Sequence, residues 1–153
     1  HIKLSPSNQL QKEVFMEIRR FDTLPESAIR VRTAVFVEEQ GFVNELDGTD
    51  QVAVHFVAFD GEKPAAACRL FWEEQKEAWI LGRLAVLKSY RGKQLGAEMM
   101  RKAEEYVREK GGRMLALHAQ CSAMEFYRKQ GYAEAGEVGY DEGCPHMWMY
   151  KNL

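Results

Sequence analysis

A strand, a basic loop and a helix follow one another in the stretch Leu84-Ala85-Val86-Leu87-Lys88-Ser89-Tyr90-Arg91-Gly92-Lys93-Gln94-Leu95-Gly96-Ala97. The first turn of a helix leaves backbone N–H groups without partners, and the helix dipole adds positive potential there. Gly92 and Gly96 let an anion approach that backbone closely, and Arg91 and Lys93 add formal charge. The stretch therefore predicts an anion site, with an ordinary solvated turn as the alternative. It matches neither the Walker A pattern nor GxGxxG.

The segments on either side of this stretch alternate between strand and helix patterns. Apolar runs predict strands over residues 52–59, 65–72, 78–87, 114–119, 132–140 and 146–150, and a further strand over 12–21, with Val14, Met16 and Ile18 on one face. Helical spacing predicts helices over 27–40 and 94–110, and a short helix that ends at Gly131. Capping-box patterns, Thr23–Glu26 and Ser122–Glu125, precede the first and third helices, and residues 41–51 are expected to be loop.

The predicted order is helix, three strands, helix, strand, helix and two strands, with an extra N-terminal strand. A meander followed by a strand–helix–strand unit predicts an α/β (α+β) fold, with a mixed and mainly antiparallel central sheet flanked by helices. The 153 residues are expected to form a single domain, 1–153, because no repeat or linker divides them.

Composition excludes several classes of protein. No apolar run approaches the ~20 residues that span a bilayer, and no signal-peptide pattern is present, so no membrane association is expected. The 21 basic and 23 acidic residues give a net charge of −2, which argues against nucleic acid as a partner. Three cysteines at wide spacing indicate reduced thiols in a cytoplasmic protein. The four histidines form no local ligand pair, so no metal site is expected.

Three motifs resemble those of the GNAT superfamily of N-acetyltransferases. Arg91-Gly92-Lys93-Gln94-Leu95-Gly96 resembles the acetyl-CoA-binding pattern R/Q-x-x-G-x-G/A, and Phe126-Tyr127-Arg128-Lys129-Gln130-Gly131-Tyr132 resembles the late F-Y-x-x-x-G-Y/F segment. Arg32-Thr33-Ala34-Val35-Phe36-Val37-Glu38-Glu39-Gln40 resembles the first helix of a bacterial branch whose members are mostly of unknown substrate. The predicted order of elements also agrees with the family's fold.

The resemblance implies direct attack of an amine on the thioester of acetyl-CoA. The pantetheine arm would lie along Leu84-Ala85-Val86 and pair with the backbone of Leu84 and Val86. The pyrophosphate would bind the backbone amides of Arg91, Gly92, Lys93, Gln94, Leu95, Gly96 and Ala97. Tyr127 would give a proton to the leaving thiolate, which suits a phenol with pKa near ~10. A buried core tyrosine is the alternative for Tyr127.

The chain departs from the family pattern at two places. Gln94 stands where the pattern has its first Gly, and its amide can still donate to phosphate. The strand before the loop, where many relatives carry a Glu as general base, reads Ile80-Leu81-Gly82-Arg83 and holds no carboxylate. The base is therefore open between Glu39, His118, His146 and a water chain. We expect Glu39, at the end of the first helix, to contact the acceptor amine or its water.

The leading function is transfer of an acetyl group to a primary amine of a small molecule or peptide, with acetyl-CoA as co-substrate. The alternative is a catalytically silent acyl-CoA-binding or sensor module. Five acids and no base occur within residues 38–50, which suggests a cationic acceptor or a solvated loop. The apolar residues 147–150 leave open a homodimer in which this strand pairs or packs.

Overall fold

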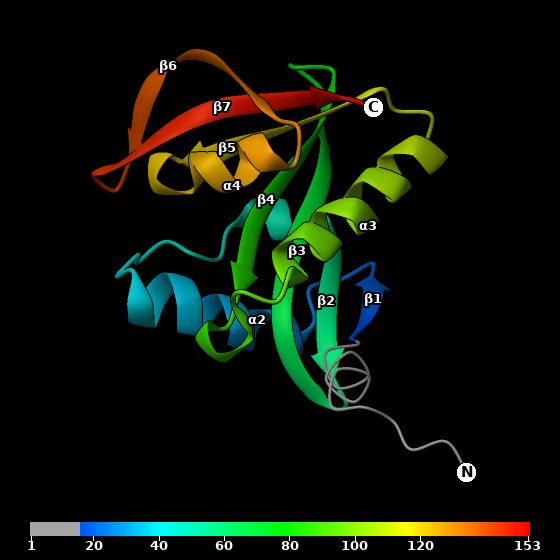
Figure 1. The fold of residues 1–153 in the computed structure, drawn as a ribbon, viewed down its shortest axis with the longest axis vertical. Helices are drawn as coiled ribbons and strands as arrows, with labels where there is room; N and C mark the ends of the chain where they lie inside the picture. Colours follow the sequence, from blue (N-terminus) through cyan, green and yellow to red (C-terminus); the bar gives the residue numbers. More distant parts are fainter. Residues whose placement is uncertain (1–15) are drawn as a thin grey trace, which may run out of the picture.

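The computed structural model describes residues 16–153, which form a seven-stranded sheet with helices on both faces (Figure 1). The strands lie in the order β1-β2-β3-β4-β5-β7-β6, and each neighbouring pair is antiparallel except β4 and β5. Their bounds are β1 Glu17–Phe21, β2 Val54–Asp60, β3 Lys63–Glu73, β4 Ala78–Val86, β5 Met114–Gln120, β6 Ala133–Asp141 and β7 Cys144–Asn152. The predicted mixed, mainly antiparallel sheet is confirmed. Val14 and the start of the predicted first strand lie outside the described residues.

The apolar strand β2 is covered on both faces, which explains why its sequence does not alternate. Phe56 and Ala58 pack in the core under α3 (Leu95–Glu109), whereas Val57 and Phe59 pack in a second core under α2 (Glu26–Arg32). A strand buried on both faces needs apolar residues at consecutive positions. The two cores therefore lie on opposite sides of the β2–β4 meander.

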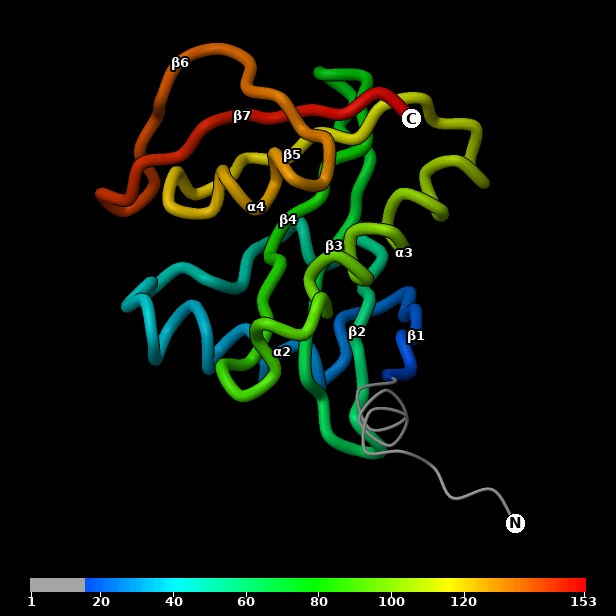
Figure 2. The backbone as a smooth tube through the Cα atoms, viewed as in Figure 1, coloured from blue at the N-terminus to red at the C-terminus, as the bar shows by residue number. Residues whose placement is uncertain are grey.

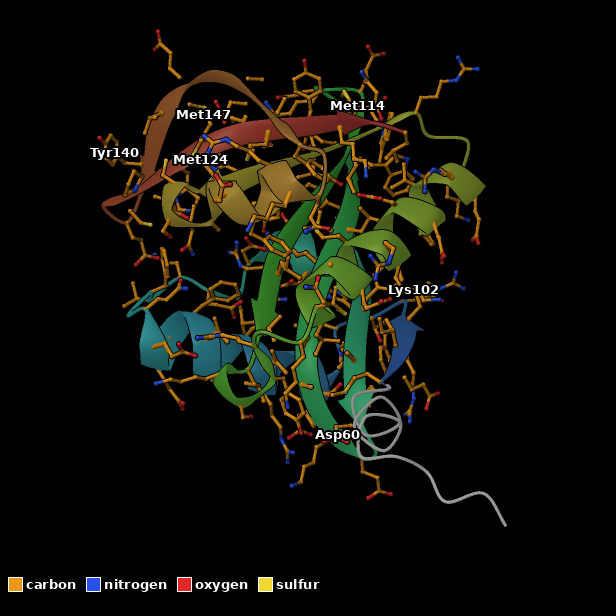
Figure 3. The ribbon with its side chains drawn as sticks, in the orientation of Figure 1. Asp60, Lys102, Met114, Met124, Tyr140 and Met147 are labelled. Atoms are coloured by element: carbon orange, nitrogen blue, oxygen red, sulfur yellow. The ribbon has the colours of Figure 1, made fainter. Side chains whose placement is uncertain are left out.

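The helices divide between these two faces of the sheet. α3 and the short α4 (Met124–Lys129) contribute to one core, and α2 contributes to the other. α2 continues directly into a π-helix over Thr33–Glu39, so the predicted helix is present with wider turns in its second half. The tube in Figure 2 shows α2 and this continuation running toward the end of β4. Side chains such as Lys102 on α3 point away from the sheet, as Figure 3 shows.

Both predicted capping boxes are wrong. α2 has Pro25 as its N-cap with no side-chain hydrogen bond, and the Pro25 carbonyl accepts from the N–H groups of Ala28 and Ile29. α4 follows a 3-10 turn over Cys121–Ala123 and also lacks a side-chain cap. A capping box occurs instead inside the predicted loop, where Asp47 and Asp50 cap the 3-10 helix Gly48–Gln51. The S/T-x-x-E pattern did not predict this capping box, because both of its residues are aspartates.

The central feature of the sheet is a split between β4 and β5. These strands pair only from Trp79 to Leu81 on β4, opposite Leu115 to Leu117 on β5. β4 then carries a bulge at which its register with β3 shifts, and Arg83 has a left-handed backbone with φ of 52°. A bulge bends a strand and re-aims its side chains. Beyond it β4 stays paired with β3 only, so its edge toward β5 is open from Gly82 onward.

The C-terminal strand β7 lies inside the sheet. It pairs with β5 along one edge and with β6 along the other, so its backbone cannot pair with a second copy of the chain. The outer position belongs to β6, where Tyr140 is 73% exposed (Figure 3). Of the two expectations for residues 147–150 in a homodimer, backbone pairing is therefore wrong, and packing across a dimer stays a prediction. No helix in the described part of the chain is long and apolar enough to cross a membrane.

Candidate functional site

Two cavities open at the split between β4 and β5. The first, of about 480 Å³, is lined by the loop and helix start after β4, and we call it the loop pocket. The second, of about 180 Å³, is lined by His118 and His146 among others, and we call it the histidine pocket. Four residues line both cavities: Gln40, Leu84, Ala123 and Tyr127. The two pockets are therefore neighbours with a shared wall.

The loop pocket brings together nine of the ten residues predicted to bind the cofactor. These are Leu84, Ala85, Val86, Arg91, Gly92, Gln94, Leu95, Gly96 and Ala97. The tenth, Lys93, is not part of the lining, and its Nζ lies over the Tyr90 ring at 5.8 Å from the centroid. The pocket combines the open edge of β4 with the N-terminal turn of the 15-residue α3, whose N–H groups lack intrahelical partners. It therefore offers backbone donors to an extended, anionic ligand.

Backbone geometry explains which residues occupy two positions at the start of α3, Gln94 and Gly96. Gln94, the N-cap of α3, has φ of 65° and ψ of 14°, a left-handed conformation that glycine adopts without steric cost. This is why a glycine is the usual residue in the motif that Gln94 departs from. A Cβ on Gly96 would lie 3.1 Å from Cζ of Phe126, so Gly96 lets α3 pack closely against α4.

Glu39 lies at the rim of the loop pocket. Its carboxylate accepts two hydrogen bonds from Arg91, of 2.8 and 3.0 Å, and Arg91 Nε donates to the Val86 carbonyl at 2.9 Å. The hydrogen bond from Arg91 is the main cause that lowers the pKa of Glu39. Glu39 is not among the residues that line the histidine pocket, so its position gives no support to the expected contact with an acceptor amine.

Tyr127, on α4, occupies the wall that the two pockets share. Its side chain is 9% exposed and packs against Phe126 and Tyr132, with ring centroids 5.1 and 6.2 Å away. Burial, with a smaller contribution from the Cys68 thiol, raises the pKa of Tyr127 well above that of a free phenol. The hydroxyl therefore keeps its proton at neutral pH and can act as a proton donor between the pockets.

Two histidines from neighbouring strands face the histidine pocket. His146 on β7 is 7% exposed, and its Nδ1 is 2.9 Å from the carbonyl oxygen of Cys144. The His118 ring on β5 stacks on Trp148 at 4.7 Å and lies 4.8 Å from the His146 ring, measured between centroids. Burial and the nearby His146 lower the pKa of His118. Both histidines that the sequence left open as bases therefore reach one cavity.

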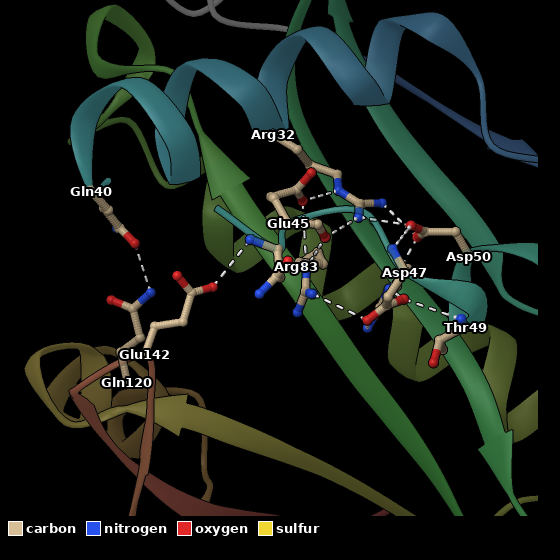
Figure 4. Close-up of polar contacts among 11 residues, drawn as sticks. Arg32, Gln40, Glu45, Asp47, Thr49, Asp50, Arg83, Gln120 and Glu142 are labelled. Atoms are coloured by element: carbon tan, nitrogen blue, oxygen red, sulfur yellow. Dashed lines mark hydrogen bonds and ion pairs between the residues drawn. The ribbon is translucent and has the colours of Figure 1, made fainter. Parts of the chain in front are cut away.

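A cluster of ion pairs, most of them buried, lies behind the wall formed by residues 44 and 45 (Figure 4). Arg32, 1% exposed, donates to Asp50 at 2.7 and 3.0 Å and also to Glu45. Arg83 donates to the Glu45 carbonyl at 3.0 Å and to Asp47 at 3.2 Å, and Arg69 donates to Asp47 and Asp50. Buried charges persist where they are paired and hydrogen-bonded in this way.

This cluster changes the interpretation of the acidic run at residues 38–50. Three of its five acids, Glu45, Asp47 and Asp50, are paired with arginines of this cluster, and Glu39 is paired with Arg91. These four acids therefore do not present free charge to a cationic acceptor. The burial of Arg32, although not its pairing with these acids, could have been predicted from the sequence. Arg32 lies in the apolar helical stripe that contains Ala28 and Val35, at a spacing that faces the core.

Two contacts join the walls of the histidine pocket from opposite sides of the split (Figure 4). Gln120 at the end of β5 donates to Gln40 at 2.8 Å. Glu142, in the turn between β6 and β7, accepts from the N–H groups of Val43 and Asn44 at 3.1 and 3.2 Å. The partners in these three hydrogen bonds are 80, 98 and 99 positions apart along the chain. These hydrogen bonds therefore tie the segment 40–44 to the end of β5 and to the turn between β6 and β7.

No group of three or more His, Cys, Asp or Glu side chains within residues 16–153 is arranged to hold a metal ion. The chemistry that the two pockets can perform rests on backbone donors, a protonated tyrosine and two imidazoles. That set suits transfer of a group between two bound molecules, one in each pocket.

Comparisons with known proteins point to one family. The profile of the Acetyltransferase (GNAT) family matches residues 16–132. The uncharacterized N-acetyltransferase YjcF of Bacillus subtilis is 37% identical over 128 residues, which cover 82% of this chain and 90% of the relative. The crystal structure of Escherichia coli ElaA is similar with a TM-score of 0.80 and 25% identity, covering 90% of this chain and 99% of that one.

An aminoglycoside 6'-N-acetyltransferase complexed with coenzyme A shares the fold, with a TM-score of 0.71 at 18% identity over 90% of this chain and 97% of that chain. The family profile spans well over half of the 153 residues. The chain therefore belongs to the GNAT family of acetyltransferases, and it is an acyltransferase.

Proposed function

We propose that the protein transfers an acetyl group from acetyl-CoA to a primary amine of a small molecule or peptide. The observation that carries this proposal is the place of Tyr127, whose buried, protonated side chain lines both the loop pocket and the histidine pocket. A group at that junction can reach the thioester sulfur from one side while the amine approaches from the other. A module that only bound acyl-CoA would need no second pocket.

The loop pocket supports binding of the acyl donor through the chain's own backbone. The first-turn N–H groups of α3 are suited to the pyrophosphate, and the open edge of β4 at Leu84 is suited to the amides of the pantetheine arm. The Val86 carbonyl already accepts from Arg91, so the arm would pair with β4 nearer to Leu84. Bound acetyl-CoA supplies the activated acyl carbon.

In the reaction the amine nitrogen attacks the thioester carbon, the new C–N bond forms and the C–S bond breaks. Tyr127 gives its proton to the leaving thiolate, which raises the rate because a free thiolate returns readily to the carbonyl. No covalent acyl-enzyme is required, and Cys121 has no part in this scheme. The small histidine pocket, about 180 Å³, favours a compact acceptor or the tip of a side chain.

The free state of all three cysteines supports a reducing compartment, and we propose the cytoplasm. The function itself is tested with radiolabelled acetyl-CoA and a panel of primary amines. The panel contains aliphatic diamines, amino-acid amides, arylethylamines and a lysine-containing peptide. Labelled amide is expected with at least one class of amine. Tight CoA binding without transfer to any of them would instead favour the silent acyl-CoA-binding module.

A further inference from the structure

Transfer to an amine requires a base, and the strand that often supplies one in this family has none here. A primary amine arrives mostly as the ammonium ion at neutral pH and cannot attack until it has lost a proton. Near the split, β4 offers Gly82 and Arg83. The following argument rests on the proposed function and asks which group of this chain removes that proton.

The carboxylates that face the histidine pocket are poorly placed for this task. Glu45 is 5% exposed, and its carboxylate is already paired with Arg32 and Arg83, so it is not free to contact an amine. Asp141, which ends β6 and lines the pocket, is exposed to water. Glu39 is bound to Arg91 outside this pocket.

His146 is oriented as a base by its own hydrogen bond. A carbonyl oxygen can only accept, so the contact of 2.9 Å requires Nδ1 of His146 to donate to the Cys144 carbonyl. The neutral ring then carries its proton on Nδ1 and its lone pair on Nε2. The ring lines the cavity and is nearly buried, which makes Nε2 the atom available to a ligand.

His118 restrains the charge of this pair. Its ring lies 4.8 Å from that of His146, and two imidazolium ions at such a distance repel each other. Burial and the neighbouring His146 lower the pKa of His118, which favours the neutral form of that ring. Stacking on Trp148 keeps the His118 ring against the sheet. The titratable and charged groups that share the pocket with His146 are His118, Glu45, Asp141, Arg83 and Tyr127.

We propose that Nε2 of His146 is the general base that removes a proton from the acceptor ammonium, with His118 as a positioning residue. One proton moves from R–NH₃⁺ to His146 and then to solvent. The free amine attacks, and the second nitrogen proton restores Tyr127 after Tyr127 has protonated the thiolate. The sum is ammonium plus acetyl-CoA giving amide, CoA thiol and one proton, so atoms and charge balance.

The test uses His146→Asn, because the Asn amide can still donate to the Cys144 carbonyl but offers no basic nitrogen. Single-turnover rates are measured with acetyl-CoA and the best amine of the panel, between about pH 5 and 9, a range that spans the ordinary pKa of imidazole. We expect a fall of ~100-fold or more at neutral pH, and loss of the acidic inflection of the wild-type profile. Added imidazole should restore part of the rate in His146→Gly. Calorimetry should give unchanged CoA affinity and thereby show that the variants are folded.

His118→Asn is the matched control, and it should keep the inflection and lose less than ~10-fold in rate, because a positioning residue supplies no proton acceptor. Three outcomes overturn the assignment to His146. These are a wild-type profile in His146→Asn, loss of the inflection only in His118→Asn, and failure of imidazole to restore any rate. None of these outcomes contradicts the proposed function, which fails only if the wild-type protein acetylates no amine.

Discussion

Glu39 and Arg91, 52 residues apart in the chain, meet in a two-point ion pair of 2.8 and 3.0 Å at the rim of the loop pocket. The pair joins the end of the first helical segment to the loop that precedes α3. Because both side chains are about 40% exposed, at 42% and 37%, the pair is screened by water and its effect on stability is small. We expect the pair chiefly to hold the loop before α3 in place.

We expect Glu39→Gln to raise the KM for acetyl-CoA by a few-fold, roughly 2- to 10-fold, because Arg91 and the loop lose an anchor. The KM for the amine and the pH profile should not change. Steady-state kinetics with each substrate varied in turn measures this, with the exposed neighbour Glu38→Gln as control. A higher KM for the amine, with acetyl-CoA unaffected, would instead support the sequence-based hypothesis that Glu39 contacts the acceptor.

Gln94→Gly should stabilise the protein. Gln94 holds a left-handed conformation, φ 65°, that costs an L-residue about 1 kcal/mol relative to glycine. Glycine's extra freedom in the unfolded chain offsets part of this gain. Thermal unfolding should show a midpoint raised by about 1–3 °C, with CoA affinity retained. Gln94→Ala is the matched control and should show no increase, because alanine also has a Cβ.

The sequence predicted most of the fold because its signals are local. Runs such as 65–72 and the helical stripe of 94–110 fall within one or two residues of β3 and α3. The missed features depend on contacts between distant segments. The bulge at Arg83 and the pairing of Arg32 with Asp50 are fixed by neighbours on other elements, which no local pattern contains.

The candidate site also has one part that the sequence predicts and one part that it does not. The backbone donors before α3 follow from a contiguous motif, so nine of ten expected residues line the loop pocket. The histidine pocket gathers one or two residues each from the π-helix, β4, β5, the 3-10 turn before α4, α4, β6 and β7, together with residues of the segment 40–45. His146 and His118 are 28 positions apart in the sequence and become neighbours only because β7 pairs with β5. Spacing along the chain therefore could not choose between His118, His146 and Glu39.

Asp50→Asn should destabilise the protein and remove part of its sensitivity to acid. Burial alone would raise the pKa of Asp50, but hydrogen bonds and charge from Arg32 outweigh it and lower the pKa to about 2. A carboxyl whose pKa is depressed on folding contributes stability above its unfolded pKa, near 3.9, and loses it as the pH falls toward 2. That contribution is about 2 kcal/mol.

Urea unfolding of wild type and Asp50→Asn at a series of pH values measures this difference. The free energies of unfolding should differ most near neutral pH and converge as the pH falls through the window between the unfolded and folded pKa of Asp50. Asp22→Asn, at an exposed position, is the control and should follow wild type. A constant difference at all pH values would contradict the assigned role of the Arg32 pairing.

Glu142→Ala should loosen the loop that forms one wall of the histidine pocket. The carboxylate accepts from two successive N–H groups, of Val43 and Asn44, and alanine removes both contacts. We expect the KM for the amine to rise by roughly 3- to 10-fold, as loss of one or two exposed hydrogen bonds implies. The KM for acetyl-CoA should remain the same. Hydrogen exchange at residues 43 and 44 should quicken, and a rate of exchange equal to wild type would show that the contact does not hold the loop.

Tyr127→Phe removes the hydroxyl at the junction of the pockets and keeps the ring that packs on Phe126 and Tyr132. If that hydroxyl protonates the thiolate, the single-turnover rate should fall by ~100-fold to 10,000-fold, the usual effect of losing a positioned general acid. CoA affinity should stay near wild type, because binding depends on the loop and α3.

Tyr132→Phe is a matched control, since its hydroxyl donates to Glu104 at 2.8 Å and lines neither pocket. That variant should lose stability and keep its rate. A Tyr127→Phe enzyme as fast as wild type, under conditions where only the chemical step is observed, would leave Tyr127 with a packing role alone.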